Sequence, residues 1–361
     1  MQKKTVVTIT GIRPDFIRMS YVFKELDLAF NHILIHTGQH FDSKLSGVFF
    51  TSLGIRNPDY ILSAGKNSSN HYEQLAYLTL EIPKLFKENN INPDLIIFLG
   101  DSNSVAVSFP LKKQGYKIAH IEAGMRSYDK RMLEEINRTV CDHCSDILFV
   151  YHENYAKQLE LENIKNEVHI VGNTIVEPVS LFKSQIMTQP KKLNCILMDI
   201  HRPENFLYES RLKGIIEFGN ACYVKYKIPV KILYFPRLAN SLEKYNLDMG
   251  SIELIDLMDF PDYLNMVYNS KFLISDSGTA QEEPALLNTP VVVPRDWTER
   301  PESFASNCSV QLFVEGTKTN SLEVFVWLEK MFSGELTMCT QWLGTGSTSK
   351  LIVEKITKYL S

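Results

Sequence analysis

Short apolar runs alternate with longer segments of helical periodicity along the whole chain. The runs are apolar throughout rather than alternating with polar residues, which is typical of strands buried on both faces. This strand–helix alternation predicts a parallel sheet with right-handed crossovers. In the first half we expect strands at 5–10, 33–37, 94–100, 116–122, 146–151 and 168–172 and helices at 14–26, 71–88, 103–114, 134–145 and 153–161.

The same pattern restarts after residues 173–192, which mix a helix with a Pro-Lys-Lys linker. Here we expect strands at 195–199, 230–235, 252–256, 271–275, 290–293 and 309–314 and helices at 208–225, 260–269 and 279–288. A chain of 361 residues is longer than one hydrophobic core usually spans. We therefore predict an α/β protein of two Rossmann-like, doubly wound domains facing a cleft. The domains are residues 1–175, joined by a C-terminal helix at 346–361, and residues 176–345.

Composition narrows the class of protein. With 44% hydrophobic and 22% charged residues, the chain resembles ordinary globular proteins. The net charge of -4 leaves no basic excess to suggest a nucleic-acid partner, and no apolar run is long enough to span a bilayer. The N-terminus lacks the features of a signal peptide, so the six cysteines suggest reduced thiols in a cytoplasm.

The densest group of acids and bases is HIEAGMRSYDKRMLEEINR at 120–138. Glu122 directly follows a predicted strand, and Glu134 opens the next helix, where the helix dipole favours a carboxylate. A capped, solvated helix start with a Glu135–Arg138 pair would explain Glu134 but explains Glu122 poorly. The stretch indicates a site where carboxylates move protons on an anionic substrate.

Two other segments in the first half carry candidate residues where a strand ends. TGIRPDFIRM at 10–19 puts Arg13 and Arg18 near a helix N-terminus, a position that favours anions. LGDSNS at 99–104 puts Asp101 after a strand and a glycine. The alternatives are surface arginines at an ordinary helix start and an aspartate that only caps the next helix.

In the second half, His201 and Arg202 follow the strand at 195–199. Arginine supplies a fixed cation and histidine a titrating donor, a combination that suits a pyrophosphate. A lone histidine is more often structural, but the adjacent arginine and the Pro-Glu-Asn turn favour a binding role.

A second candidate loop is the segment 274–302. Ser277, Gly278 and Thr279 lead from a strand into a helix, and such small residues let backbone N–H groups approach a phosphate. Glu282 or Glu283, one turn later, could accept both hydroxyls of a ribose. This loop is the most specific of the candidates, because loop, helix and acid occur in one order.

Two further motifs are not taken as sites. CDHC at 141–144 is a single Cys-x-x-C inside a helix, whereas a zinc site needs about four ligands. GTGSTS at 344–349 is rich in glycine, but no strand leads into it, so it is not a dinucleotide fingerprint. We therefore expect neither a metal nor NAD.

Together, the stretches at 10–19, 99–104, 120–138, 200–206 and 274–302 resemble the motif set of the UDP-N-acetylglucosamine 2-epimerases, in order and spacing. The similarity covers nearly the whole chain. Residues 35–60 look more like the branches that act on modified sugars, such as diacetamido-uronate or 6-deoxy-hexosamine nucleotides.

The resemblance implies a glycosyltransferase-B architecture with UDP held mainly by the C-terminal half, inversion at C2 without a cofactor, and a homodimer. The residues that match the catalytic groups of the family are Asp101, Glu122, Glu134 and His201. The residues that match its nucleotide contacts are Arg13, Ser277, Gly278, Thr279 and Glu283, to which we add Arg18, Arg138 and Arg202 as candidate anion contacts.

The expected substrate, a UDP-activated 2-acetamido sugar, needs such a set of groups. C2 has no adjacent carbonyl, so its proton is not acidic enough for simple abstraction. The C1–O bond would break first, and one carboxylate would remove the C2 proton to give a glycal. A second acid would then protonate C2 from the other face, and UDP would add back. Two faces require at least two carboxylates.

Some positions depart from the family pattern. Arg18 replaces a usual lysine, Leu133 a common proline and Phe235 a common histidine, and Pro203 replaces a common Arg or Glu. Phe41 follows the Gln-His pair where substrate-activated members have arginine, so we do not expect substrate activation. Three other functions stay open: a hydrolysing 2-epimerase, a glycosyltransferase of the same fold, and an inactive nucleotide-sugar-binding protein.

Overall fold

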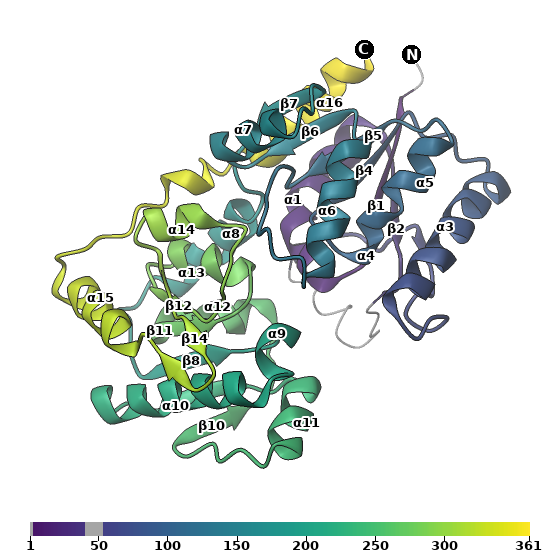
Figure 1. Cartoon of the computed structure of the whole chain (residues 1–361). Helices are drawn as coiled ribbons and strands as arrows, with labels where there is room; N and C mark the ends of the chain where they lie inside the picture. Colours follow the sequence, from purple (N-terminus) through teal and green to yellow (C-terminus); the bar gives the residue numbers. More distant parts are fainter. Residues whose placement is uncertain (1–2, 40–52) are drawn as a thin grey trace. The chain divides into compact units, whose positions relative to one another are not determined.

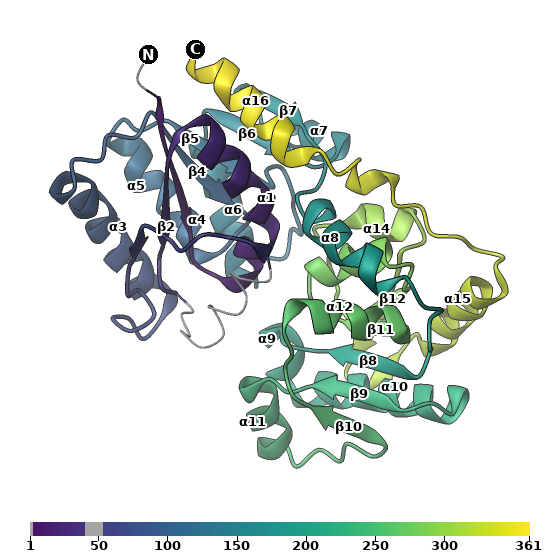
Figure 2. The same ribbon diagram turned by 180° about the vertical axis from the view of Figure 1, so that it is seen from behind.

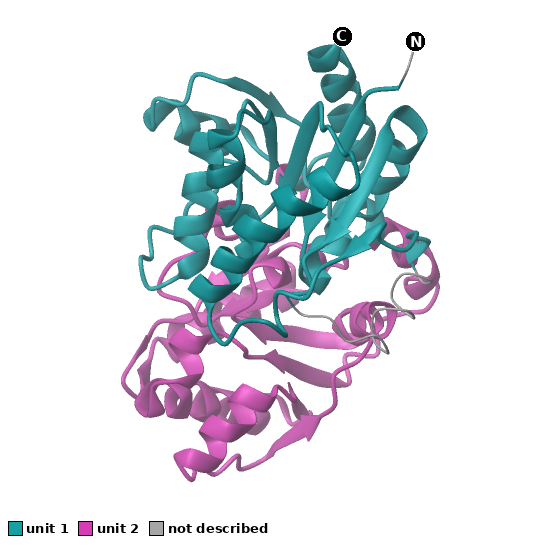
Figure 3. Ribbon diagram, turned by 90° about the vertical axis from the view of Figure 1, so that its right-hand side faces the viewer, with its two compact units in different colours: residues 1–178, 343–361 teal, residues 179–342 magenta. Residues whose placement is uncertain are grey.

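The computed structural model describes residues 3–39 and 53–361. The chain divides into two compact units, which Figure 3 shows in different colours. Unit 1 comprises residues 1–178 and 343–361, and unit 2 comprises residues 179–342. From the sequence we expected residues 1–175 with a C-terminal helix at 346–361, and residues 176–345.

Unit 1 is built on a parallel sheet that has seven strands in the described residues. Its strands are β1 (Thr5–Thr10), β2 (Asn31–His36), β3 (Tyr60–Ile61), β4 (Leu95–Leu99), β5 (Ile118–Ile121), β6 (Ile147–Val150) and β7 (Glu167–Ile170). The order across the sheet is β3-β2-β1-β4-β5-β6-β7. Its helices are α1 (Arg13–Ala29), α3 (His71–Glu88), α4 (Asn103–Ala106), α5 (Ser108–Lys113), α6 (Leu133–Cys144), α7 (Glu153–Leu161) and α16 (Thr348–Leu360). Helix α8 (Val176–Ile186) leads into unit 2.

Unit 2 repeats the plan with a six-stranded parallel sheet (Figure 1). Its strands are β8 (Cys195–Asp199), β9 (Val230–Leu233), β10 (Ile252–Ile255), β11 (Ser270–Ser275), β12 (Val291–Val293) and β13 (Ser309–Gln311), in the order β10-β9-β8-β11-β12-β13. Its helices are α9 (Pro203–Phe206), α10 (Glu209–Tyr226), α11 (Pro236–Lys244), α12 (Phe260–Asn269), η1 (Thr279–Gln281), α13 (Glu283–Leu286), α14 (Pro301–Ala305) and α15 (Ser321–Ser333), and η2 (Gln341–Leu343) lies where the chain returns to unit 1. A short antiparallel pair, β14 (Val314–Glu315) and β15 (Lys318–Thr319), completes it.

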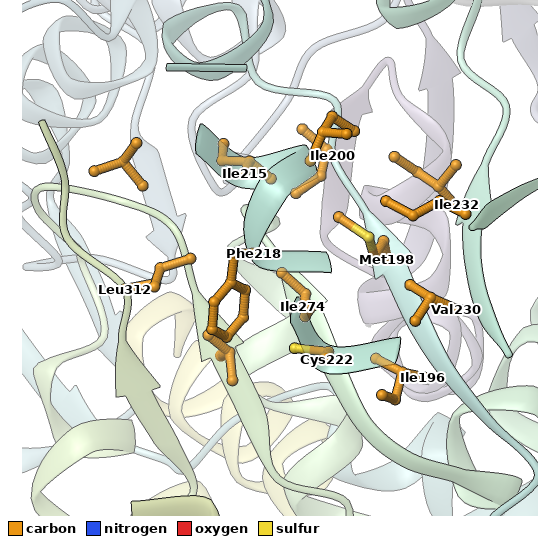
Figure 4. Packing of buried hydrophobic residues seen from close by; sticks show 14 of the residues in the cluster. Ile196, Met198, Ile200, Ile215, Phe218, Cys222, Val230, Ile232, Ile274 and Leu312 are labelled. Carbon is orange, nitrogen blue, oxygen red and sulfur yellow. The ribbon is translucent and has the colours of Figure 1, made fainter. Parts of the chain in front are cut away.

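The core of unit 2 shows how tightly helix and sheet pack. Ile215 and Phe218 on α10 belong to the same buried cluster as Met198 on β8 and Ile274 on β11 (Figure 4). A Cβ on Gly219 would lie 2.9 Å from the Met198 sulfur and 2.9 Å from Ile252 Cδ1, so a larger residue would require these side chains to move. Helix α10 therefore packs directly on the sheet of unit 2.

Both sheets have the Rossmann strand order, in which the direction of winding reverses next to the first strand. The reversal lies between β1 and β4 in unit 1 and between β8 and β11 in unit 2. Ligands of open α/β sheets bind at the carboxyl ends of the strands at such a switch point. A ligand site is therefore expected in the loops that follow these four strands and the strands next to them.

Most expected strands and helices are present, and the differences have local causes. The helix expected at 103–114 is interrupted at Val107, since Pro110 has no N–H for a continuous helix. Pro284 likewise makes the helix expected at 279–288 a 3₁₀ turn followed by a short helix. Helices α9, α11, α14 and α15 were not expected from the sequence.

The C-terminal helix belongs to unit 1. Figure 2 shows α16 running beside α1, and the two helices pack together. Thr348 Oγ1 donates to the carbonyl of Val171 over 3.0 Å, and Ser349 Oγ donates to Glu177. In the described part of the chain, no helix is both long enough and apolar enough to cross a membrane.

Candidate functional site

Carboxylates gather at the switch point of unit 1, around Gly100. Gly100 follows β4 with a φ of 73°, a left-handed conformation that favours glycine. A Cβ built on it would lie 3.7 Å from Glu122 Oε2 and 4.0 Å from Asp15 Oδ1. Two buried acids from different elements therefore approach the same piece of backbone.

Glu122 has a strained backbone. Its φ of 72° is in the left-handed region, which non-glycine residues seldom adopt. Its side chain is buried and forms an ion pair with Arg18 Nη1. Arg18 also lies 5.6 Å from the ring centroid of Tyr151. Strain of this kind clusters at functional sites, which supports the prediction that Glu122 is more than a packing residue.

A buried ionic network supports this edge. His120 donates through Nε2 to the carbonyl of Gly100 over 2.8 Å, and its Nδ1 lies 2.6 Å from Asp142 Oδ1. Asp142 also accepts from the backbone N–H of Gly124 and pairs with Arg126. Burial alone would lower the pKa of His120, but Cys141 and Asp142 raise it well above its usual range. The charged imidazole thus fixes the end of β4.

Asp101 forms an ion pair with an arginine of helix α6. Arg138 Nη2 forms an ion pair with Asp101 Oδ2, and Arg138 Nε lies 3.7 Å from Glu135 Oε2. The N-cap position of α4 is occupied by Ser102 rather than by Asp101. The structure therefore brings Asp101 and Arg138 together, and the simple helix-cap alternative does not describe Asp101.

Asp15 is a member of this cluster that the sequence did not single out. It accepts hydrogen bonds from Thr10 Oγ1 over 3.0 Å and from Ser102 Oγ over 3.5 Å, and it is buried. Burial, reinforced by the charge of Asp101, raises the pKa of Asp15 to about 7. In the sequence it looks like an ordinary acid in the first turn of a helix, and only the tertiary fold shows its environment.

The adjacent acids that open α6 have different environments. Glu135 is buried and accepts from the backbone N–H groups of Ser127 and Tyr128, over 3.0 and 2.8 Å. Its contact with Arg138 confirms that alternative pairing. Glu134 is half-buried and makes no hydrogen bond or ion pair with the residues that the structure describes. Glu135 therefore holds the preceding loop, whereas Glu134 remains a candidate for contact with a ligand.

In unit 2, two buried aspartates hold the loop after β8. The backbone N–H groups of His201 and Arg202 donate to the carboxylate of Asp276, over 3.0 and 3.1 Å. His201 Nδ1 lies 2.9 Å from Asp199 Oδ1. Burial would lower the pKa of His201, but the charges of Asp199 and Asp276 outweigh it and raise the pKa. The two aspartates therefore favour the protonated form of His201, and Asp199 fixes the orientation of its ring.

Gly278 adjoins a group of buried arginines and glutamates. A Cβ on Gly278 would lie 2.6 Å from both Arg300 Nη1 and Glu299 Oε1, so a larger residue would displace this ion pair. Arg300 Nε donates to Glu282 over 2.6 Å, and Arg295 Nη2 donates to Glu299 over 2.8 Å. Glycine thus lets the loop after β11 lie directly against the buried Arg300–Glu299 ion pair.

The two acids that the sequence left open have separate partners. Glu282 binds Arg300, whereas Glu283 is buried near Tyr263. Burial raises the pKa of Tyr263, and the charges of Asp199 and Glu283 raise it further. Both acids are buried, so the geometry does not choose between them, and it is the resemblance that favours Glu283 as a nucleotide contact.

The remaining predicted residues lie at the same two edges. Ser277 Oγ and Thr279 Oγ1 are 3.2 Å apart in the loop after β11. Arg202 Nη2 is 3.9 Å from Glu299 Oε1, and Arg13 begins α1 with a half-buried side chain. The ring of Phe235 lies 5.1 Å from the ring of His201. His40 and Phe41 lie outside the described residues.

The segments 141–144 and 344–349, which we did not take as sites, lie in a helix and at the start of a helix. Cys141 and Cys144 are buried thiols on α6, and His143 faces Glu162. Among residues 3–39 and 53–361, no group of three or more His, Cys, Asp or Glu side chains is arranged to hold a metal ion. The glycine-rich segment at 344–349 leads into α16, consistent with a loop.

Comparison with known proteins gives one consistent result. The sequence profile of the family described as UDP-N-acetylglucosamine 2-epimerase matches residues 24–357. A UDP-N-acetylglucosamine 2-epimerase of Methanococcus maripaludis is 34% identical over an aligned length of 369 residues, and the alignment covers 96% of this chain and 96% of that protein. A UDP-2,3-diacetamido-2,3-dideoxy-D-glucuronate 2-epimerase of Pseudomonas aeruginosa is 32% identical over 336 residues, covering 87% of this chain and 92% of that protein.

The structural comparison agrees. The crystal structure of the Methanocaldococcus jannaschii UDP-GlcNAc 2-epimerase, in complex with UDP-GlcNAc and UDP, matches with a TM-score of 0.87 and 29% identity. The match covers 98% of this chain and 99% of that chain. It confirms the predicted class of two Rossmann-like α/β domains.

Proposed function

The chain belongs to the UDP-N-acetylglucosamine 2-epimerase family, and we propose that it inverts C2 of a UDP-activated 2-acetamido sugar by eliminating and re-adding UDP. The observation that carries this proposal is the pair of ion-paired carboxylates at the switch point of unit 1. These are Glu122 with Arg18 and Asp101 with Arg138. An inversion through a planar carbon needs one group on each face, and two held carboxylates supply them.

The reaction begins when the C1–O bond breaks and UDP leaves with the bonding electrons. The cationic His201 and Arg202, in the loop after β8, stabilise the negative charge that develops on the departing diphosphate. The backbone of Ser277, Gly278 and Thr279 lies against phosphate oxygens, and Glu283 accepts the ribose hydroxyls.

One carboxylate of unit 1 then takes the proton from C2, which leaves a glycal with a C1–C2 double bond. A second acid returns a proton to the opposite face of C2, and the oxygen of UDP adds to C1. Asp101, Glu122 and Glu134 are the groups that we assign to these two proton transfers. The positive charges of Arg13, Arg18 and Arg138 offset the repulsion between these carboxylates and the anionic substrate.

The relatives are named for different sugars of this class. The Methanococcus relative is named for UDP-N-acetylglucosamine and the Pseudomonas relative for a diacetamido sugar acid. We propose a UDP-2-acetamido sugar, and a panel that includes modified and 6-deoxy forms identifies it by proton NMR. The homodimer and the cytoplasmic location remain predictions from the sequence.

The decisive experiment is incubation of the protein with the UDP-sugar in deuterated water. We expect deuterium at C2 of the product, since the returning proton comes from groups that exchange with solvent. Retention of the original hydrogen at C2 would exclude deprotonation there. Free sugar that accumulates in step with UDP would instead identify a hydrolysing 2-epimerase. An absolute requirement for an acceptor, without exchange at C2, would identify a glycosyltransferase.

A further inference from the structure

Unit 2 contains a cavity of about 320 Å³ at the edge of its sheet where β8, β11 and β12 begin. This edge is opposite the one with the candidate nucleotide loops, because His201 and Ser277 follow the carboxyl ends of β8 and β11. The volume is within the range of small-molecule sites. Much of the lining is apolar and comes from Leu193, Pro290, Met331, Phe332, Leu336 and Met338.

Lys191 brings an ammonium group to this cavity, and no acid that the structure describes pairs with it. Its Nζ donates to the carbonyl of Asn288 over 2.5 Å and to Thr289 Oγ1 over 2.9 Å, and both acceptors are neutral. An ammonium group has three N–H donors, so these two contacts leave one for a ligand. Burial lowers the pKa of Lys191 to about 8, as expected for a charged amine that is enclosed without a counterion.

Lys271 is the second cation of the lining. Its Nζ lies 4.0 Å from the centroid of the Phe332 ring and 5.2 Å from that of the Tyr226 ring. With the described residues it makes no hydrogen bond or ion pair, so its three donors are available to water or a ligand. Glu335, which lies in the same segment of the chain as Phe332, is already paired with Lys330 over 2.9 Å. The cavity therefore combines an apolar lining with two ammonium groups.

We propose that this cavity binds a small organic carboxylate with an apolar body. The two carboxylate oxygens accept hydrogen bonds from Lys191 and Lys271, and the body packs against Met331, Leu336 and Met338. Methionine side chains adapt to apolar ligands of varied shape, which suits such a site. A bare inorganic anion would exchange part of its hydration for a few donors and would leave the apolar lining uncovered.

This site is independent of the proposed epimerase function, since none of the lining residues belongs to the candidate site of either unit. A bound acid would be a ligand in addition to the UDP-sugar. The alternative is a purely structural role, in which the lysine stems cover apolar surface and the ammonium groups interact with aromatic rings. That alternative predicts that no acid binds.

Titration calorimetry of the wild type with a matched set of compounds is the first test. Octanoate and 4-phenylbutyrate join a carboxylate to an aliphatic or an aromatic body, and we expect at least one of them to bind. Octanol keeps the body without the charge, and acetate keeps the charge without the body. Each of these should bind at least about 10-fold more weakly than the better acid. The better acid also identifies the kind of body that fits.

Lys191→Met and Lys271→Met remove the charges and keep the apolar stems. Each should weaken the binding of the better acid by about 10- to 100-fold, since a hydrogen bond to a charged group is lost. The matched control is Lys192→Met, because Lys192 is the next residue but lines a different cavity, and it should keep wild-type affinity. If Lys191→Met does not fold, Lys271→Met decides, because its ammonium group makes no hydrogen bond with the described chain.

Methyl NMR locates the bound acid. In protein with isotopically labelled methionine methyl groups, the signals of Met331 and Met338, assigned by Met→Leu variants, should shift when the better acid is added. The signal of Met125, which is buried in unit 1, should not move. Saturation with UDP should leave the affinity for the acid unchanged, since the candidate nucleotide loops lie at the opposite edge of the sheet.

Three results would overturn the proposal: octanol that binds as tightly as the better acid, wild-type affinity in Lys271→Met, or displacement of the bound acid by UDP. Absence of binding by both acids would leave the lysines with the structural role alone and would also overturn it. These measurements need no turnover, so they remain decisive even if the deuterium experiment excludes the epimerase reaction.

Discussion

The two sheets have the same strand order but carry candidate functional groups of opposite charge. Both wind outward from their first strand, and both carry their polar groups after strands that flank the reversal or lie next to it. In unit 1 the acids Asp101 and Glu122 are the candidate reacting groups, and arginines hold them. In unit 2 the roles are exchanged, since the buried Asp199 and Asp276 hold the cationic loop that carries His201.

This difference shows what the fold decides and what it leaves to single residues. The strand order determines where a ligand can bind, because strand ends and open loops coincide only at the reversal. The side chains there determine whether the edge transfers protons or binds an anion. If this difference is real, substitutions at the site of unit 1 should lower turnover, and substitutions at the site of unit 2 should weaken nucleotide binding.

The largest expected effect tests the acids of unit 1. Glu122→Gln and Glu134→Gln should each lower turnover by about two to four orders of magnitude, as expected for general acid–base groups. Affinity for UDP, measured by calorimetry, should stay close to that of the wild type.

Glu135→Gln is the matched control for Glu134→Gln, because Glu135 is occupied by the N–H groups of Ser127 and Tyr128. It should lower the free energy of unfolding by about 1–3 kcal/mol, the penalty for a disrupted buried hydrogen bond. Normal turnover in both the Glu122 and Glu134 variants would show that these carboxylates of unit 1 do not transfer protons in the reaction.

A smaller effect is expected at the glycine of unit 2. The methyl group of Gly278→Ala would enter the space of Arg300 Nη1 and Glu299 Oε1, each 2.6 Å away. Overpacking of this kind costs about 1–3 kcal/mol, so UDP affinity should fall by roughly 10- to 100-fold. Titration of UDP into the purified variant measures the change.

Gly219→Ala controls for overpacking within the same unit, since its Cβ would meet Met198 in the core rather than the loop. It should lower the melting temperature and leave the UDP affinity of the folded protein unchanged. Equal losses of UDP affinity in both glycine variants would show that the effect is one of general destabilisation.

The smallest effect concerns the pH dependence of binding. The pKa of His201 is raised by Asp199 and Asp276 against the effect of burial, so its charge, and the UDP affinity it supports, is lost as the pH rises through that pKa. Asp199→Asn should move this loss to lower pH, by about one unit or less. Asp296→Asn, which removes a partner of Arg211 instead, should leave the midpoint in place. Identical midpoints in all three proteins would remove His201 from the binding of UDP.

Sequence patterns were sufficient for the main strands of both sheets, because strands buried on both faces form uninterrupted apolar runs, but they missed the two-residue strands β3 and β15. The strand at 195–199 and the helices at 71–88 and 153–161 have the expected bounds. Helix α15 was missed, since SLEVFVWLEKMF mixes aromatic and β-branched residues that do not distinguish helix from strand. Helix α11 is short and follows β9 after a single turn, so its periodicity is difficult to recognise.

For the candidate site, the rule that ligands bind at strand ends was enough to select Asp101, Glu122 and His201. It could not find the groups that support them, because these are distant in sequence. His120 and Asp142, or His201 and Asp276, meet only after the sheet has formed. Asp15 was missed for the same reason, since its neighbours Ser102 and Asp101 come from the other side of the switch point.

The return of the chain to unit 1 has a consequence for synthesis in the cell. A ribosome makes α16 only after all of unit 2, yet α16 packs against α1, one of the first helices to emerge. At typical elongation rates, α1 waits roughly 15–65 s for its cover, and in this interval unit 2, a continuous segment, is translated and can fold. During that interval nascent unit 1 exposes apolar surface that α16 will bury with Ile352 and Ile356, so chaperone capture should be concentrated there.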